Sequence, residues 1–384
     1  MLAGCVPVVL SNQAVGYIIK RMESGIVANY HPIGEVIMKK KVKFSIIIPS
    51  KNTLKYLKDN VESIIGQKYD DYELIICDNH SNDGTYEWVN SLKNPHVTLI
   101  RPKEPLLMTE NFAFALSHAN GDWIQMLGAD DGVQPFYFQL ADYFIKKAEN
   151  NNISVINFPR AYFFWEGCES IYNDAGISFI AHAGYTIKNT KYALLSALIS
   201  ENVYFNIPHL YTMSIIHHSM IENIKKNSGV FYYSTCIHDA SSAASVCSFG
   251  GRYLQSFIPL TWVGTSNLAV GFPSSEAKNN EINMTLARDL KWNRQMGTID
   301  IAFCIKELHF YLYEAVLQCR NLQTIFWKLF FSSKWFKTLV FANVFAIIEK
   351  SQQKVDCLVR VLDLNKIPLK RVVFFSFAYI TICL

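Results

Sequence analysis

The sequence between residues 43 and 160 repeats one pattern, in which a short apolar run precedes a segment with helical spacing. The first run covers residues 44–48, and apolar residues then recur at helical intervals between Leu54 and Ile65. Further runs of this kind lie at residues 72–77, 97–100, 122–127 and 153–158. This alternation predicts an α/β fold with a mainly parallel sheet and helices on both faces.

The composition narrows the classes of protein to consider. The chain has 384 residues, of which 50% are hydrophobic, so it can bury a large core. Its formal net charge of +4 is small for this length and does not indicate a nucleic-acid partner. The nine Cys residues form no CxxC pair, and neither a secretory signal nor an apolar run of about 20 residues is evident. These features predict a reducing, cytoplasmic location.

Polar residues follow three of the expected strands. They lie in residues 49–52, 78–84 and 128–132. In open parallel sheets, ligands bind beyond the carboxyl ends of the strands. We therefore expect the three loops to converge on one crevice.

The third loop contains two adjacent carboxylates, Asp130 and Asp131. Adjacent carboxylates repel one another unless a cation neutralises them, and hard oxygen ligands suit Mg²⁺ or Mn²⁺ that bridges a diphosphate. The alternative is that Asp-Asp-Gly is a simple turn. The position of the pair after a buried strand, facing two other polar loops, favours the metal site.

Several ordered motifs resemble the donor domain of family 2 glycosyltransferases, which have the Rossmann-like GT-A fold. The matching residues are 45–52, 63–67, 72–85, Asn111, 121–124 and the acidic loop.

The resemblance implies roles for individual residues. The positions that it assigns to the donor nucleotide are Pro49, Ser50, Asn52, Asp78, Asn111 and Asp130. Asp131 and Asp130 would serve a Mn²⁺ or Mg²⁺ ion and the diphosphate. The chain departs from the family at Gly128, where many members have the first Asp of an Asp-x-Asp motif, and at Asn79, which replaces a frequent second Asp.

A weaker resemblance to a bacterial subgroup continues to about residue 275, through residues 207–211, 237–243 and 259–267. In the family, an acid at the position of Asp239 deprotonates the acceptor hydroxyl. Asp239 could instead be a helix N-cap, since residues 240–246 could begin a helix. We interpret His217, His218 and His238 as surface or packing residues.

Both ends of the chain differ from this central region. Residues 1–40 resemble a truncated nucleotide-binding piece of family 4 glycosyltransferases, which have the GT-B fold. We therefore expect three parts, namely residues 1–40, a GT-A domain at 41–275 and a helical extension at 276–384. The GT-A domain would comprise a donor half at 43–160 and an acceptor half at 160–275.

The helical extension is aromatic and basic. Residues 320–384 carry ten Lys and Arg against three Asp and Glu. Its aromatic helices could lie in the interface of an anionic membrane, or they could pack on the catalytic domain.

The resemblance implies an inverting glycosyltransferase that takes a sugar from a nucleotide-diphosphate donor. The acceptor would be a saccharide or lipid-linked saccharide, in bacterial surface polysaccharide or glycolipid assembly. One alternative is a nucleotide-sugar nucleotidyltransferase, although that class should have a Gly-rich, basic loop where residues 49–52 stand. Another is a non-catalytic domain that binds a sugar or a partner protein.

The N-terminal segment lacks the partners to make a nucleotide site by itself. Deletion of residues 1–38 is therefore expected to leave donor affinity unchanged in isothermal titration calorimetry. A tenfold rise in the dissociation constant, about 1.4 kcal/mol, would show that the segment contributes to the active site.

Overall fold

The computed structural model describes residues 42–166, 168, 177–178, 182–199, 207–233, 237–266, 308–319, 325–348, 355–356, 358–359, 362–363 and 366–383. The expected N-terminal segment 1–40 and the whole stretch from 267 to 307 lie outside these residues. The domain boundaries at 41 and 275 therefore stay predictions.

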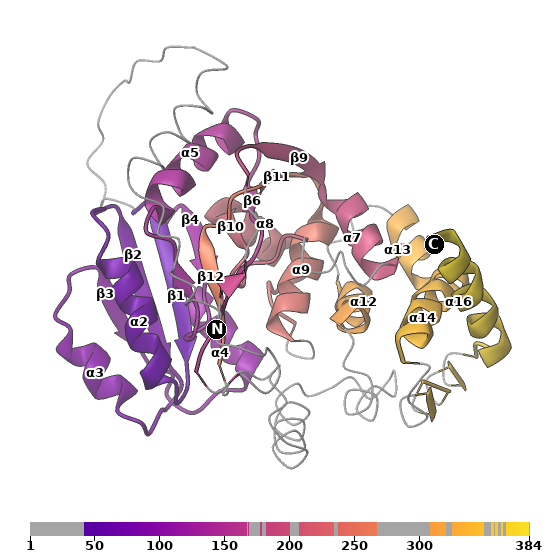
Figure 1. Cartoon of the computed structure of the whole chain (residues 1–384), viewed down its shortest axis with the longest axis horizontal. Coiled ribbons are helices and arrows are strands. Elements are labelled where there is room, and N and C mark those ends of the chain that lie inside the picture. Colours follow the sequence, from indigo (N-terminus) through magenta and orange to yellow (C-terminus); the bar gives the residue numbers. More distant parts are fainter. Residues whose placement is uncertain are drawn as a thin grey trace, which may run out of the picture.

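The centre of the molecule is an eight-stranded sheet (Figure 1). Its first four strands, in spatial order, are parallel: β3 (Val97–Ile100), β2 (Tyr72–Asp78), β1 (Phe44–Ser50) and β4 (Trp123–Met126). The sheet continues through β10 (Ser214–His217), β6 (Val155–Asn157), β11 (Arg252–Ser256) and β9 (Tyr185–Asn189). Strand β10 comes from the expected acceptor half and pairs, antiparallel, with β4 and β6 of the expected donor half. Strands from the two halves therefore form one sheet.

Both faces of the sheet are apolar, and each is covered by helices. One face packs against α2 (Leu54–Ile65), α3 (Thr85–Ser91) and α5 (Tyr137–Glu149). The other packs against α4 (Met108–Leu116), α8 (His218–Ser228) and α9 (His238–Phe249). Strands β1, β2 and β4 are buried on both sides, which explains why their sequences are largely continuous apolar runs.

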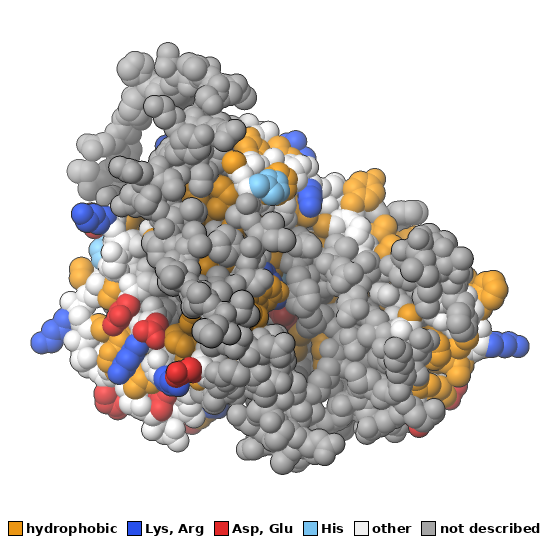
Figure 2. Space-filling model, viewed as in Figure 1, with side chains coloured by type: hydrophobic (Ala, Val, Ile, Leu, Met, Phe, Trp, Pro, Cys, Tyr) orange, Lys and Arg blue, Asp and Glu red, His pale blue; other side chains and the backbone are white. Residues whose placement is uncertain are grey.

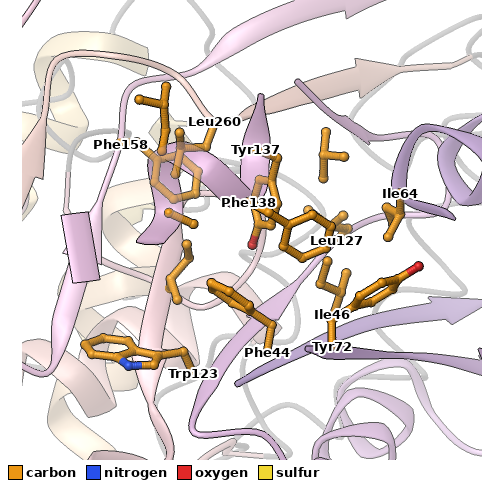
Figure 3. Close-up of a cluster of buried hydrophobic side chains, with 14 of the residues drawn as sticks. Phe44, Ile46, Ile64, Tyr72, Trp123, Leu127, Tyr137, Phe138, Phe158 and Leu260 are labelled. Atoms are coloured by element: carbon orange, nitrogen blue, oxygen red, sulfur yellow. The ribbon is translucent and has the colours of Figure 1, made fainter. Parts of the chain in front are cut away.

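Aromatic side chains fill the core beneath α5 (Figure 3). The Phe44 ring is edge-on to those of Tyr69 and Phe138, with centroid distances of 5.7 and 5.5 Å, and these two rings stack on each other at 4.4 Å. Large buried rings of this kind contribute much of the apolar area that a domain removes from water. These contacts hold the start of β1 against α5 and thereby set the direction of β1 and the position of the polar residues at its end.

A small second sheet lies beside the end of β4. It contains β5 (Gly132–Val133), β12 (Thr261–Thr265), β7 (Ala161–Phe164) and β8 (Ile177–Ser178). The antiparallel pair of β12 and β5 begins directly after the two adjacent carboxylates. This sheet therefore ties the acidic loop to a segment more than a hundred residues further along the chain.

The C-terminal helices stand on the side of the molecule away from β3 (Figure 1). They are α12 (Leu308–Gln318), α13 (Ile325–Ser332), α14 (Lys334–Ile348) and α16 (Leu369–Cys383). α16 packs on α14 in a separate apolar cluster. α12, α13 and α14 share another apolar cluster with α7 (Thr190–Ile199), and it includes Ala240, Ala244 and Cys247 of α9. Phe331 and Phe336 are buried in this cluster, whereas Trp335 is 50% exposed.

The helices of the described part of the chain include none that combines the length and the apolarity needed to cross a bilayer. The surface over α2 and α3 carries acidic and basic side chains side by side (Figure 2). This distribution agrees with the small net charge of the sequence.

Between residues 43 and 160, the helices and strands lie close to the positions that the sequence predicts. The helix expected from about residue 135 to 147 is α5, at Tyr137–Glu149. The fifth strand is shorter than the apolar run that predicts it, because only Val155–Asn157 pair with a neighbour. The fold class is confirmed as a mainly parallel α/β sheet with flanking helices and a helical C-terminal region.

Candidate functional site

Hydrogen bonds join the loops after β1 and β2 into one unit. The backbone amide of Asn52 donates to Ser81 Oγ at 2.9 Å, and the backbone amide of Asn82 donates to Asn52 Oδ1 at 2.8 Å. Asn52 has a φ of 55°, a left-handed conformation that Asn tolerates better than most residues. Asp83 Oδ2 accepts the Leu54 amide at 2.8 Å and so fixes the start of α2. Asn52 and Asp83 also line a hollow of about 470 Å³ beside these loops.

Asp78 is buried at the carboxyl end of β2 and is engaged by an arginine. Arg101 Nε donates to Asp78 Oδ2 at 2.8 Å, and its Nη2 forms an ion pair with the same oxygen. The guanidinium also lies 4.0 Å from the centre of the Tyr86 ring. The sequence analysis missed Arg101, although its place directly after β3 was a signal that it belonged to this edge.

Three other residues expected at the donor site lie in or behind these loops. Pro49 sits in β1 in register with Cys77, and Ser50 Oγ lies 2.8 Å from Thr53 Oγ1. Asn111, in α4, is buried and its Oδ1 accepts a hydrogen bond from the Cys77 thiol at 3.2 Å. Asn111 thus supports the end of β2 from the α4 face, and its contact with a nucleotide stays a prediction.

The acidic loop is held in place by the carboxylate of Asp131. Its Oδ2 accepts the Gly128 amide at 2.5 Å, and its Oδ1 accepts the Gly264 amide at 2.8 Å. Asn60 Nδ2 of α2 donates to the Gly128 carbonyl at 2.6 Å. The loop is therefore fixed from three sides, by its own backbone, by α2 and by β12.

Asp130 is the more accessible of the two carboxylates. Its Oδ2 accepts a hydrogen bond from Ser266 Oγ at 2.7 Å, and its carbonyl accepts one from Trp165 Nε1 at 2.8 Å. The Trp165 ring also packs on Tyr56, with centroids 4.8 Å apart. Ser266 and Trp165 are site residues that the sequence did not single out, because they are distant from Asp130 along the chain.

Gly264 allows β12 to approach the acidic loop. A Cβ atom built at this position would lie 1.6 Å from the Asp130 carbonyl oxygen, so no side chain fits without displacing the loop. Close backbone approach of this kind is a common reason for glycine within a strand.

Burial raises the pKa values of both carboxyl groups. Burial, followed by the charge of Asp130, raises the pKa of Asp131 to about 8, against the opposing effect of its two amide donors. Burial also raises the pKa of Asp130, and the Ser266 hydrogen bond opposes this. The pair therefore favours binding of a proton or a cation.

The donor set fits a hard divalent cation in part. Two adjacent carboxylates supply oxygen ligands of the type that Mg²⁺ and Mn²⁺ prefer. Among the described residues, no group of three or more His, Cys, Asp or Glu side chains could hold a metal ion alone. A cation here would take its remaining ligands from the phosphates of a substrate and from water.

Asp239 lies in the first turn of α9, so the alternative that it is the N-cap of this helix is wrong. The helix begins at His238 and its N-cap is Ile237, which has extended dihedral angles. Asp239 Oδ1 accepts the backbone amide of the next residue, Ala240, at 2.8 Å. The carboxylate is near the positive end of the helix dipole, which stabilises a negative charge there.

One tyrosine connects Asp239 with the acidic loop. The charges of Asp131, Asp130 and Asp239 all raise the pKa of Tyr211, after the larger effect of its burial. The Tyr211 ring contacts the His238 ring edge-on, with centroids 4.6 Å apart. The structure thus brings the predicted base and the predicted metal ligands to the same region.

His217, His218 and His238 make packing or capping contacts, as expected. His217 Nδ1 accepts the Ser219 amide at 3.2 Å and caps α8. His218 Nδ1 lies 3.0 Å from the Gly121 carbonyl oxygen and its Nε2 lies 3.7 Å from Glu222. His238 stacks on Phe112, with centroids 3.8 Å apart.

Comparison with known proteins assigns a family to the larger part of this site. Residues 45–214 match the model of glycosyl transferase family 2. The chain is 34% identical over 92 residues to putative glycosyltransferase EpsE of Bacillus subtilis, a match that covers 23% of this chain and 33% of EpsE. It is 28% identical over 117 residues to the glucosyltransferase WfaP of Escherichia coli, which covers 27% of this chain and 47% of WfaP. The matched stretch thus spans less than half of either relative.

A solved structure shares the fold over most of the chain. Residues 1–349 of S. aureus TarS, in a crystal structure with UDP-GlcNAc, superpose with a TM-score of 0.50. The match covers 87% of this chain and 84% of that one, at 16% sequence identity. At this identity the likeness supports the fold alone.

The raised pKa of Asp131 gives an expected pH dependence. Because its folded pKa of about 8 exceeds the usual value of 3.8, the folded state holds an extra proton between these pH values, and its contribution to stability falls as pH rises. In thermal denaturation with EDTA, wild type should therefore lose stability relative to Asp131→Asn as the pH rises from 5 to 9. A difference that stays constant over this range would contradict the assignment.

Proposed function

Residues 45–214 belong to glycosyl transferase family 2, and from this premise we propose that the protein transfers a sugar from a nucleotide-diphosphate donor to a hydroxyl acceptor. The single observation that supports it best is the arrangement of two polar centres at one edge of the sheet. Asp78 with Arg101 follows β2 and β3, and Asp130 with Asp131 follows β4. The strands β2 and β4 flank β1 and so lie roughly 10 Å apart, a distance that suits the length of a nucleotide.

In this proposal the donor lies across the carboxyl end of β1. Residues 49–52 and Asp78 bind the nucleoside, with Asn111 behind them. Arg101, which already pairs with Asp78, fixes that carboxylate and offers a flat cationic surface beside Tyr86. The diphosphate then lies beside the acidic loop, where the negative charge of its phosphates requires a cation.

Asp130 and Asp131 would hold a Mn²⁺ or Mg²⁺ ion together with the diphosphate. Such an ion would stabilise the negative charge that develops on the departing nucleoside diphosphate. Of the two side chains, Asp130 is the more accessible, whereas both oxygens of Asp131 already accept backbone hydrogen bonds. We therefore propose Asp130 as the principal ligand and Asp131 as the residue that shapes the loop.

We propose a single displacement with inversion at the anomeric carbon. Asp239 accepts the proton of the acceptor hydroxyl as that oxygen forms a bond to the anomeric carbon. The bond between the anomeric carbon and the diphosphate oxygen breaks, and its electron pair leaves with the nucleoside diphosphate. Binding both substrates between the acidic loop and the first turn of α9 supplies the required alignment.

The acceptor is proposed to be a saccharide or lipid-linked saccharide in bacterial surface polysaccharide or glycolipid assembly. WfaP, a similar protein, is a UDP-Glc:alpha-D-GlcNAc-diphosphoundecaprenol beta-1,3-glucosyltransferase. The C-terminal helices expose Leu329, Trp335 and Phe374, and the same helices carry Lys334, Lys337, Lys370 and Arg371. Exposed apolar and basic side chains suit a peripheral contact with anionic lipid on the cytoplasmic side.

A non-catalytic sugar-binding domain is the second candidate, because Gly128 removes one carboxylate of the family motif. The two functions differ in turnover. Incubation with UDP-, GDP- and dTDP-sugars, with and without Mn²⁺, should release a nucleoside diphosphate only if the protein is a transferase. Binding of a nucleotide sugar without any release, even when saccharide acceptors are added, would favour the non-catalytic function.

The two acidic residues should respond differently to substitution. Asp130→Asn is expected to weaken Mn²⁺-dependent donor binding at least tenfold in calorimetry, with little change in melting temperature. Asp131→Ala should also lower the free energy of unfolding, because two buried amides lose their acceptor, at about 1–3 kcal/mol each. Asp70→Asn, whose side chain is fully exposed, is the matched control. Donor binding by Asp130→Asn equal to wild type would exclude its role as the ligand.

The base is tested by Asp239→Asn, which keeps the shape of the side chain but cannot accept the proton. We expect normal donor binding, a melting temperature near that of wild type and sugar transfer slowed about 10²–10⁴-fold. Glu222→Gln on the exposed face of α8 is the control and should retain full transfer. Transfer by Asp239→Asn within a few fold of wild type would assign the base to another residue.

A further inference from the structure

The space left by the missing carboxylate at position 128 is filled by a side chain from another part of the chain. A Cβ atom built on Gly128 would lie 2.5 Å from Tyr211 Oη, closer than any real Cβ contact. It would also lie 2.9 Å from Asp131 Oδ2 and 3.1 Å from Asp130 Oδ1. The Tyr211 hydroxyl therefore stands beside both carboxylates, where a side chain at position 128 would begin.

Tyr211 is held rigidly in this place. The Met126 amide donates to the Leu210 carbonyl at 3.4 Å, and the Thr212 amide donates to the Met126 carbonyl at 2.7 Å, so residues 210–212 continue along the end of β4. The Tyr211 ring is edge-on to Phe112 at 5.6 Å and to His238 at 4.6 Å. A glycine at position 128 and a tyrosine at position 211 thus fit together as a pair.

The hydroxyl differs from a carboxylate in what it can bind. A tyrosine hydroxyl, with a usual pKa of about 10, keeps its proton at neutral pH. A protonated phenol can donate a hydrogen bond directly to a phosphate or sugar oxygen, whereas a carboxylate needs a cation between itself and a phosphate.

A second observation points to a missing hydrogen-bond partner beside this hydroxyl. Both ring nitrogens of His238, which packs against Tyr211, are buried without a hydrogen-bond partner among the described residues. Burial lowers the pKa of His238 to about 4, so the ring is neutral and can both donate and accept. Buried polar atoms without partners are rare in native proteins and call for a missing partner.

We propose that Tyr211 Oη replaces the absent carboxylate as a donor-binding group and donates a hydrogen bond to the glycosyl-diphosphate end of the donor. Its position between the acidic loop and Asp239 places it where the transferred sugar meets the leaving diphosphate. His238 supports the Tyr211 ring at this position. This inference rests on the proposed glycosyltransferase function.

The test distinguishes binding of the glycosyl-diphosphate end of the donor from binding of its nucleoside end. Tyr211→Phe keeps the ring contacts with Phe112 and His238 but removes the hydroxyl. Binding of UDP-glucose, UDP-N-acetylglucosamine, GDP-mannose and dTDP-glucose is measured by calorimetry, alongside UMP, GMP and dTMP. We expect Tyr211→Phe to bind the preferred nucleotide sugar at least tenfold more weakly and the matching monophosphate as wild type does. Tyr192→Phe, at a side chain that is 68% exposed, is the matched control.

A double-mutant cycle tests whether the hydroxyl fills the space at position 128. Gly128→Ala should lower the melting temperature in the wild-type background and lower it less when Tyr211 is replaced by Phe, because the closest contact is then gone. Equal effects in both backgrounds, or unchanged nucleotide-sugar affinity in Tyr211→Phe, would overturn the inference alone. Failure of the wild type to bind any of the nucleotide sugars would instead overturn the proposed function and the inference with it.

Discussion

The candidate site depends on the two hydrogen bonds that the Asp131 carboxylate accepts from the amides of Gly128 and Gly264. These bonds join the end of β4 to β12, residues 133 positions apart in the chain. A buried carboxylate with two amide donors is favourable only while both donors remain, so the loop and β12 hold each other in position. Through this contact Ser266 and Trp165 reach Asp130, and the acidic loop takes one conformation before any substrate arrives.

The position of Asp239 depends on a different kind of constraint. Helix α9 is buried on both sides, against the central sheet through Val246 and against α12 through Ala240 and Ala244. Small residues on the α12 side let the two helices approach closely, and nine consecutive residues of α9 are buried. The C-terminal helices thus form part of the frame that points the first turn of α9 toward the acidic loop. A change in their packing would therefore shift Asp239 through the tilt of this helix.

The sequence predicts the strands and the polar loops well, but it does not predict the contacts between distant segments. Strands β1, β2 and β3 are apolar runs bounded by polar residues, which periodicity detects, and the loops after β1, β2 and β4 carry the expected side chains. The pairing of Arg101 with Asp78 and the filling of Gly128 by Tyr211 arise from tertiary packing and leave no periodic signal. The sequence leaves the start of α9 open, because an aspartate before a run of small residues resembles an N-cap, whereas in the structure Ile237 adopts the extended cap conformation.

The charge balance of the site links these features. Two carboxylates lie side by side with both pKa values raised, and Tyr211 adds a neutral donor where the family pattern has a third acid. With two carboxyl groups instead of three, less positive charge is needed to bring a diphosphate beside the loop. The same substitution removes one oxygen ligand for a cation, so the metal would be held more by the substrate and less by the protein. A site of this kind should bind the cation and the donor together, because each supplies what the other lacks.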